Sequence, residues 1–325
     1  MFIAADTLDD LLIACFTALI KDGKAEKAQR GSFLELIGAS LELSNPRARL
    51  SRSETKGKPF SCLGELLWYL SGSNQLDQIK WYIPAYEFDA EADGTLHGAY
   101  GPRLTNAQGQ NQLQNVVDLL RTRKTSRRAV IQLFSALDLA ASYKEIPCTT
   151  TIQFLCREEQ LHCIVTMRSN DAFKGLPHDI FCFTMLQEIL AREIGIEVGT
   201  YKHFAGSLHL YDDSVKDAKT YLSEGYHSPI AMPAMPSGSQ WASIEKVLNA
   251  EHAIRTSDDA VAIDDTLPDY WKDLVRLLEA FRYSGDEDRV ATISKAMDSD
   301  VYRYYLERRK SIKRPTRAGK KKDAS

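Results

Sequence analysis

The sequence lacks a strong charge of either sign and any regular grouping of its cysteines. Its 325 residues carry 41 lysines and arginines and 44 aspartates and glutamates, which leaves a formal net charge of -3. Nothing in that balance favours nucleic acid or an anionic membrane as a partner. The six cysteines show no CxxC pair and no metal-ligand spacing, so we expect no metal site. Free thiols without a targeting segment predict a reducing, cytoplasmic compartment.

Long uninterrupted apolar runs are also absent. Residues 1–20 are rich in apolar side chains, but Asp6, Asp9 and Asp10 interrupt them and no basic segment precedes them. This pattern predicts an amphipathic helix and not a signal peptide or a membrane span. At the other end, residues 308–323 are basic and have no apolar periodicity. We expect a solvated, partly disordered tail there, with no role as a binding arm.

Internal repeats and a regular alternation of strands and helices are missing too, which argues against a doubly wound fold. Apolar runs, some of them alternating, predict strands at residues 32–45, 129–135, 151–157, 160–169 and 197–211. Helical spacing predicts helices at residues 61–72, 112–128, 179–195, 267–285 and 287–297. The glycine-rich residues 94–104 predict a loop. The fold class is therefore α+β, with a mixed or mainly antiparallel sheet.

One change of composition suggests how the chain is divided. Residues 228–240 are rich in proline, glycine and serine and predict a connector. We expect a main domain over residues 1–225 and a helical C-terminal part over residues 226–311 that packs on the same domain. Residues 312–325 form the basic tail.

Cys148 stands directly after Pro147, at the start of an apolar strand. Because proline cannot donate to a β-ladder, this position predicts a strand start or bulge and places the cysteine at an end of the sheet. Composition alone favours a buried structural cysteine. A nucleophilic thiol is the alternative, and it needs cations that lower its pKa, for which Arg127, Arg128 and Arg168 are candidates. A cysteine–histidine hydrolase with His178, His203 or His209 as base has no local motif to support it.

Six short motifs help to decide between a structural and a nucleophilic role for Cys148. They are GELLWYLSGSN, GAYGPRL, SRR, PCTTTIQFL, MRSNDAFKGLPHDI and HFAGSLHLYDD, in this order over roughly residues 25 to 215. Together they resemble the thymidylate synthase family. The resemblance implies a large mixed or antiparallel sheet with helices on one side, in a homodimer that packs sheet on sheet and shares its active sites. It also implies transfer of a one-carbon unit from 5,10-methylenetetrahydrofolate to carbon 5 of a pyrimidine nucleoside monophosphate.

The same resemblance implies roles for the residues nearest the chemistry. Cys148 matches the nucleophile that adds to carbon 6 of the base and so makes carbon 5 nucleophilic. Glu65 matches the glutamate that handles protons around the ring, and its apolar neighbours predict a buried setting that raises its pKa. Tyr100 matches a tyrosine near the nucleophile and the base. Asp171 matches the aspartate that positions the folate and the ring, and Trp81 is expected to contact the folate.

The resemblance also predicts which residues bind the nucleotide. Arginine forks suit the phosphate because they bind its oxygens bidentately. The phosphate residues are Arg168, Ser169, Arg127, Arg128 and Arg30, of which Arg127 and Arg128 come from the partner subunit. The sugar hydroxyl is expected to bind His209 and Tyr211. These residues are compatible with ribose and with deoxyribose.

The chain departs from thymidylate synthases at the position that reads the base, where Asp179 replaces an asparagine. A carboxylate repels the carbonyl group at carbon 4 of uracil and accepts a hydrogen bond from the amino group of cytosine. It can also share the proton that ring nitrogen 3 gains as the thiol adds. The same exchange characterises the cytidylate and deoxycytidylate hydroxymethyltransferases of the family. We therefore expect hydroxymethylation of CMP or dCMP.

Other departures bear on the reaction. The chain has a basic end and a helical region after about residue 225, where thymidylate synthases have terminal strands and an apolar tail that closes before hydride transfer. A hydroxymethyltransferase adds water instead, which agrees with this difference. Met167 and Thr149 replace a glutamine and a histidine beside the base pocket. Three alternatives stay open: a thymidylate synthase, a cytidylate methylase, and a non-catalytic family member that binds a nucleotide or a partner.

Overall fold

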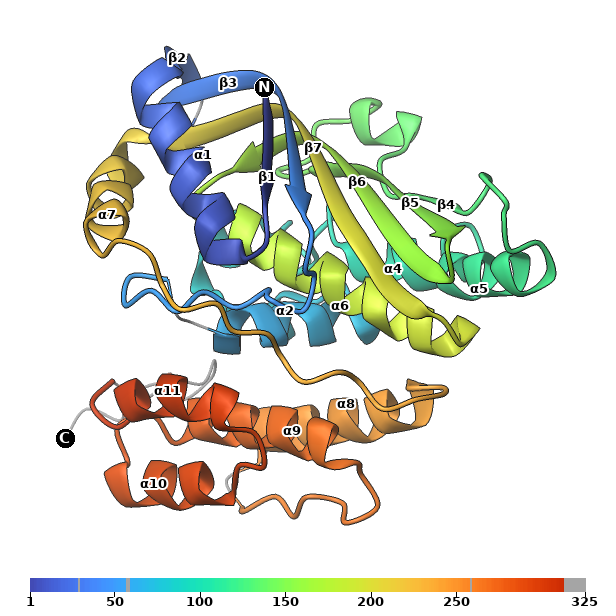
Figure 1. Ribbon diagram of the computed structural model, residues 1–325, viewed down its shortest axis with the longest axis vertical. Coiled ribbons are helices and arrows are strands. Elements are labelled where there is room, and N and C mark those ends of the chain that lie inside the picture. Colours follow the sequence, from blue (N-terminus) through green and yellow to red (C-terminus); the bar gives the residue numbers. More distant parts are fainter. Residues whose placement is uncertain (29, 57–58, 258, 313–325) are drawn as a thin grey trace.

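The computed structural model describes residues 1–28, 30–56, 59–257 and 259–312, which form a seven-stranded sheet and the helices packed on it (Figure 1). The strands are β1 (Phe2–Ala5), β2 (Lys24–Ala28), β3 (Gly31–Leu43), β4 (Val130–Gln132), β5 (Thr149–Arg157), β6 (Gln160–Asp171) and β7 (Glu197–Tyr211). Their order is β1-β3-β7-β6-β5-β4, with β2 paired to β3. β1 runs parallel to β3 and β6 parallel to β7, while the other pairs are antiparallel. The predicted α+β class with a mixed sheet is confirmed.

The register of the sheet separates a buried face from an open one. One row of paired residues is almost completely buried and consists of Ile131, Ile152, Val165, His203 and Leu41. The next row contains Val130, Gln153, Ile164, Lys202 and Glu42, none of which is fully buried. Because successive side chains of a strand point to opposite faces, the second row lies on the face away from the core.

The helices pack on the buried face, and α2, α4, α5 and α6 lie together on that side of the sheet in Figure 1. The helical segments of the main part are α1 (Leu8–Asp22), α2 (Pro59–Leu70), α3 (Leu76–Lys80), η1 (Pro84–Phe88), α4 (Tyr100–Thr105), α5 (Gln112–Thr122), η2 (Ala136–Leu139), α6 (Leu176–Ile194) and α7 (Asp212–Ser223). Most of α6 is buried between the sheet and α2. It ends at Gly195, whose φ of 83° is a left-handed conformation that suits glycine.

Four further helices form a group below the sheet, orange to red in Figure 1. They are α8 (Trp241–Thr256), α9 (Asp269–Arg282), α10 (Glu287–Ala296) and α11 (Asp300–Arg309). The ring of Phe281 in α9 lies 5.2 Å from the ring of Tyr82, and the hydroxyl of Tyr82 donates to buried Glu251 of α8 over 3.0 Å. Gly64 of α2 leaves room for this tyrosine, since a Cβ there would lie 2.1 Å from its ring. The C-terminal helices thus pack on the helix that carries Glu65.

The connector before α8 is fixed to α6 by a buried carboxylate. Glu188 accepts hydrogen bonds from Nε of Arg47 over 2.9 Å and from the backbone N–H of Met235 over 3.0 Å. It also pairs with fully buried Arg49. A buried carboxylate needs such partners, because an unpaired charge away from water is costly. The division of the chain near residue 225 stays a prediction.

Most of the predicted elements are present, with some corrections. The N-terminal helix begins at Leu8, after a short strand that the sequence did not predict. The prediction of a loop over residues 94–104 is wrong in its second half, where α4 begins at Tyr100. The prediction of a solvated tail over residues 308–323 is wrong at its start, because Arg308 and Arg309 belong to α11, and residues 313–325 lie outside the described part of the chain. Among the helices described, none is long and apolar enough to cross a bilayer.

Candidate functional site

A cavity of about 980 Å³ opens where the start of β5 and the ends of β6 and β7 meet α2, α4 and α6. Its size lies at the upper end of the range for small-molecule sites, about 300 to 1,000 Å³. The structure brings together here most of the residues predicted for the site. They are Arg30, Glu65, Tyr100, Cys148, Arg168, Ser169, Asp171, Asp179, His209 and Tyr211.

Cys148 lies directly before β5 and is held beside Arg168 of β6. The backbone N–H of Arg168 donates to the carbonyl of Cys148 over 2.8 Å. Its guanidinium donates to the carbonyls of Pro147 and Ile146, both over 3.0 Å, and Nη2 lies 3.6 Å from the Cys148 sulfur. Burial raises the pKa of the thiol to about 12, and Arg168 opposes this only in part. The thiol is therefore neutral in the free protein, and the expected effect of arginine is outweighed by burial.

Glu65 is enclosed on α2, as its apolar neighbours predicted. One of its oxygens accepts hydrogen bonds from the hydroxyls of Tyr69 over 3.0 Å and of Tyr86 over 2.6 Å. Burial raises the pKa of Glu65, and the two tyrosine hydroxyls offset part of that shift. A carboxyl group whose pKa is raised can both give and take a proton near neutral pH.

Tyr100 begins α4 and faces the same cavity. Its hydroxyl oxygen accepts hydrogen bonds from the backbone N–H of Thr149 over 3.0 Å and from the side chain of Thr149 over 2.9 Å. Because both bonds are accepted, the hydroxyl hydrogen of Tyr100 remains free to be donated elsewhere. Thr149 therefore orients the tyrosine, which gives this departure from the family pattern a structural role.

Asp179 lies in the first turn of α6, where it meets Asn170 at the end of β6. The amide nitrogen of Asn170 donates to Oδ2 of Asp179 over 2.7 Å, and both side chains are buried. Burial raises the pKa of Asp179 well above its ordinary value, and the carboxyls of Glu65 and Asp171 add to the rise. The Asn170 hydrogen bond acts in the opposite direction. Burial and the neighbouring carboxyls therefore favour the neutral carboxylic acid form of Asp179.

Asp171 and His209 stand opposite each other in the parallel pairing of β6 and β7. Oδ1 of Asp171 accepts the backbone N–H groups of Phe173 over 2.8 Å and of Lys174 over 2.9 Å, which shapes the turn into α6. Burial lowers the pKa of His209, although Asp171 opposes the shift. The rings of His209 and Tyr211 are 5.0 Å apart in an edge-to-face arrangement. A neutral imidazole beside a phenol can hydrogen-bond hydroxyl groups without adding charge.

Arg30 reaches the cavity wall from the turn between β2 and β3, where it meets two carboxyl groups. It forms ion pairs with Asp89 and, over 3.4 Å, with Glu145. Burial raises the pKa of Glu145 to about 7, and Asp89 adds to this while Arg30 opposes it. Carboxyls therefore occupy Nη2 of the guanidinium that was predicted to bind phosphate.

Residues 17–252 match the sequence pattern of thymidylate synthases. The chain belongs to the thymidylate synthase family. A deoxyuridylate hydroxymethyltransferase of Delftia phage PhiW-14 is 28% identical over 277 residues, 76% of each chain. A thymidylate synthase of Francisella tularensis subsp. holarctica (strain FTNF002-00 / FTA) is 28% identical over 190 residues, 54% of this chain and 68% of that one. The protein is an enzyme of one-carbon transfer to a pyrimidine, and 5,10-methylenetetrahydrofolate is the family's one-carbon donor.

Part of the cavity lining is apolar and exposed. Phe88 and Leu139 line it yet are 84% and 73% exposed, so each has a large apolar surface that a planar ligand can cover. Tyr143 lines the same side, with its ring stacked on His97 at 3.4 Å. Asp171 is within the cavity, where the resemblance to thymidylate synthases predicted a folate contact.

Three predicted residues of the thymidylate synthase pattern do not line the cavity of their own chain. Arg127 and Arg128 lie exposed on the connection between α5 and β4. This position is compatible with a contact to the partner subunit's site, and that contact stays a prediction. Trp81 is buried behind the site, 6.1 Å from the ring of Phe281. Tyr86, five positions further along the chain, lines the cavity and bonds to Glu65, while the folate contact of Trp81 stays a prediction.

Other residues of this family member were missed from sequence. Asn170 follows Ser169 in the quoted motif, but no pattern indicated that its amide meets Asp179. Asp89 and Glu145 are far apart in sequence, and the fold brings them together beside Arg30. The one available signal was an unusual charge directly upstream of the nucleophile, at Glu145.

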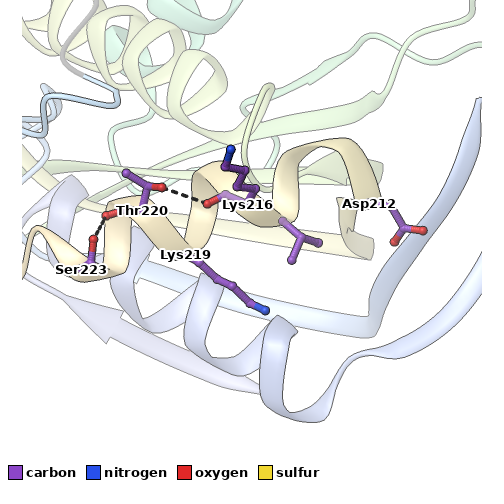
Figure 2. Close-up of a pocket in the computed structure, with 6 residues that line it drawn as sticks. Asp212, Lys216, Lys219, Thr220 and Ser223 are labelled. Carbon is purple, nitrogen blue, oxygen red and sulfur yellow. Dashed lines mark hydrogen bonds between the residues drawn. The ribbon is translucent and has the colours of Figure 1, made fainter.

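A second hollow runs along α7 and is shallow and open (Figure 2). It is lined by Asp212, Val215, Lys216, Lys219, Thr220 and Ser223. Two side-chain hydroxyls there donate to backbone carbonyls of the same helix, from Thr220 over 3.1 Å and from Ser223 over 2.6 Å. Such a surface of exposed, locally bonded side chains carries no catalytic constellation.

Proposed function

We propose that the protein hydroxymethylates a cytidine 5′-monophosphate, CMP or dCMP, through a covalent adduct with Cys148. The observation that carries the proposal is Asp179, a buried carboxyl group that lines the cavity of a thymidylate synthase fold and whose raised pKa favours the neutral acid. Its hydroxyl can donate to ring nitrogen 3 of cytosine, and its other oxygen can accept from the amino group. An enzyme that forms such a pair rejects a base with the wrong edge, because buried polar groups are left unpaired.

The proposed addition uses one proton and one electron pair. The sulfur of Cys148 bonds to carbon 6 of the base, and the electron pair of the carbon 5–carbon 6 double bond moves into the ring. Asp179 gives its proton to nitrogen 3 and is restored by the proton that the thiol loses. The net result is a thioether at carbon 6, a proton on nitrogen 3 and a nucleophilic carbon 5. Because the free thiol has a raised pKa, this coupled transfer avoids a free thiolate.

Bound methylenetetrahydrofolate supplies the one-carbon unit that carbon 5 receives. In this chain Phe88, Leu139 and Tyr143 would hold its flat rings, and Asp171 would hydrogen-bond to it. Glu65 is placed to move protons near the ring, through the carboxyl oxygen that is not bonded to both tyrosines. Support for a hydroxymethyl product comes from the phage relative that bears this activity in its name and aligns with 76% of the chain.

A second candidate is action on dUMP, which the names of both relatives favour. A neutral carboxylic acid can also pair with uracil if its carbonyl oxygen faces nitrogen 3 and its hydroxyl faces oxygen 4. The product would be hydroxymethyl-dUMP or, with a reductive step, dTMP. The orientation of the Asp179 proton therefore separates the two candidates.

We further propose a homodimer that packs the open faces of two sheets together. Phe204 and Val130 are 40% and 43% exposed on strands of that sheet, which a second subunit would cover. Arg127 and Arg128 would then reach the phosphate in the partner's cavity, where Arg168 and Ser169 bind it from the first subunit. His209 and Tyr211 would hydrogen-bond the sugar.

Incubation with CMP, dCMP or dUMP and methylenetetrahydrofolate tests the function. Product mass distinguishes a hydroxymethyl from a methyl group, and absorbance reveals any dihydrofolate. The proposal expects a hydroxymethyl product from a cytidylate without dihydrofolate, and no turnover by Cys148→Ser. Methylation of dUMP alone would sink it, while an active Cys148→Ser variant would exclude the covalent route.

A further inference from the structure

Asn170 and Asp179 form a buried pair from two different elements. The amide nitrogen of Asn170, at the end of β6, lies 2.7 Å from Oδ2 of Asp179 in the first turn of α6. Their side chains are 4% and 8% exposed. Gly175 makes room for the pair, because a Cβ at that position would lie 3.1 Å from the Asn170 nitrogen and 3.5 Å from Oδ2. The approach of the two side chains is thus built into the turn.

The other half of the Asn170 amide makes no hydrogen bond to the described residues. Its carbonyl oxygen is enclosed and has no hydrogen-bond partner within the described part of the chain. An enclosed acceptor without a partner costs free energy, and such groups in native proteins call for a functional explanation. The single bond to Asp179 is what the amide supplies.

That bond decides where a proton on Asp179 resides. An amide nitrogen can only donate, so Oδ2 must act as an acceptor and cannot carry the hydrogen toward Asn170. The carbonyl oxygen of a carboxylic acid is a better acceptor than its hydroxyl oxygen, so the bond from Asn170 favours the proton on Oδ1, for which no hydrogen bond is found among the described residues. Asp179 lines the cavity, so Oδ1–H is available as a donor to a bound base.

We propose that Asn170 is a positioning residue that fixes the proton of Asp179 on Oδ1 and thereby selects a base whose ring nitrogen 3 is an acceptor. Neutral cytosine has such a nitrogen, whereas uracil carries a hydrogen there. The inference rests on the proposed function, since it explains how one carboxyl group can discriminate between two bases that a freely rotating acid would accept alike.

Other titratable groups lie close enough to Asp179 to interact with it electrostatically. They are Glu65 and Cys62 of α2, Tyr100 of α4, Asp171 of β6, Cys182 of α6, Tyr201 of β7 and Cys148 before β5. Asn170 is the neighbour that favours the carboxylate form. Its removal therefore raises the pKa of Asp179. Cytidylate affinity, which falls as Asp179 loses its proton, should then begin to fall at a higher pH than in wild type.

Two variants test the inference in the full-length protein, with dCMP and dUMP binding measured by calorimetry without folate between pH 6 and 9. Asn170→Ala removes the donor. Asn170→Asp keeps the size but replaces the donor by an acceptor, so that Asp179 turns its proton toward residue 170 and presents a bare oxygen to the base. We expect the ratio of dCMP to dUMP affinity to fall about tenfold or more in both variants, and furthest in Asn170→Asp.

Gln187→Ala is the matched control. This buried amide of α6 donates to carbonyls of β6 and β7 and does not line the cavity. Its loss should lower the melting temperature and leave the affinity ratio as in wild type. An unchanged ratio in Asn170→Asp, or an equal loss for both nucleotides with an unshifted pH dependence, would overturn the inference. The ratio of dCMP to dUMP affinity in wild type tests the proposed function. The change of this ratio in the variants tests the role of Asn170.

Discussion

The sulfur of Cys148 lies 3.6 Å from Nη2 of Arg168, yet the pKa of its thiol is raised to about 12. Burial therefore outweighs a guanidinium at close range, and the free enzyme has an unreactive cysteine. In the proposed mechanism, the thiol becomes nucleophilic only when a bound base accepts its proton through Asp179. This arrangement protects the thiol from alkylation and oxidation until a nucleotide is bound.

Arg168→Met should make the thiol of Cys148 less reactive still, because Arg168 is the group that lowers its pKa. In wild type, the rate at which iodoacetamide alkylates Cys148 should rise steadily with pH up to pH 10. In the variant, this rate should be about tenfold lower for each unit by which the pKa of Cys148 rises above its wild-type value. Mass spectrometry of the modified peptide measures it. Cys148→Ser serves as the control for the five other cysteines, which are all buried. Equal rates in both proteins would contradict the role of Arg168.

Tyr86→Phe should shift the pH dependence of turnover. The hydroxyl of Tyr86 bonds to Glu65 over 2.6 Å and lowers the pKa of that carboxyl. Without it the pKa of Glu65 rises further, so the limb of the kcat profile that reports Glu65 should move to higher pH. Glu65→Gln should lower kcat by about 10² to 10⁴-fold and abolish that limb. Tyr69→Phe is the matched comparison, since its longer bond of 3.0 Å predicts a smaller shift.

Glu145→Gln should change how stability depends on pH. The pKa of Glu145 is raised in the folded state from 4.5 to about 7, so the folded protein holds a proton that the unfolded chain releases. The stabilisation is present in full below about pH 4.5 and is lost as the pH rises to about 7. Wild type should therefore lose free energy of unfolding over this window relative to the glutamine variant. Urea denaturation at pH 5 and pH 8 measures the difference, and parallel stabilities of the two proteins would contradict it.

Gly64→Ala should destabilise the fold and reduce activity together. The added methyl would lie 2.1 to 2.5 Å from ring atoms of Tyr82, which cannot move away without breaking its bond to Glu251. We expect a loss of about 1 to 3 kcal/mol in urea denaturation, as for other overpacked sites. In a double-mutant cycle, Tyr82→Leu should recover part of that loss. Strict additivity of the two changes would show that the ring is not the obstacle.

Much of the fold was predictable because the strongest patterns are local. The apolar periodicity of α6, its glycine stop at Gly195 and the alternation along β7 each reside within one segment. The motif residues Cys148 and Glu65 were found in the same way. Short elements escaped: β1 is only four residues long and is stabilised by its parallel pairing with β3, which no local pattern reveals.

The contacts that tune the site could not be predicted, because they join segments far apart in sequence. Glu145 and Arg30 are 115 positions apart, and Tyr82 and Glu251 are 169 apart. Trp81 illustrates the limit: an aromatic residue at about the right place in sequence is buried behind α2, and Tyr86 reaches the cavity. Hydrophobic packing determines which of these two aromatic residues is buried. For Trp81 this packing involves Phe281 of the helical C-terminal part, which lies outside the motif.

The most direct test of the account compares kcat/KM for dCMP and dUMP in wild type and in Asp179→Asn, with hydroxymethylated product measured for each. An asparagine offers an acceptor to the N–H of uracil and a donor to its carbonyl, so the variant should reverse the preference. We predict that wild type favours the cytidylate by about 10²-fold or more and that Asp179→Asn favours dUMP. The contradicting result would be a wild-type enzyme that prefers dUMP and an Asp179→Asn variant with the same preference. It would show that Asp179 does not determine which base the enzyme accepts.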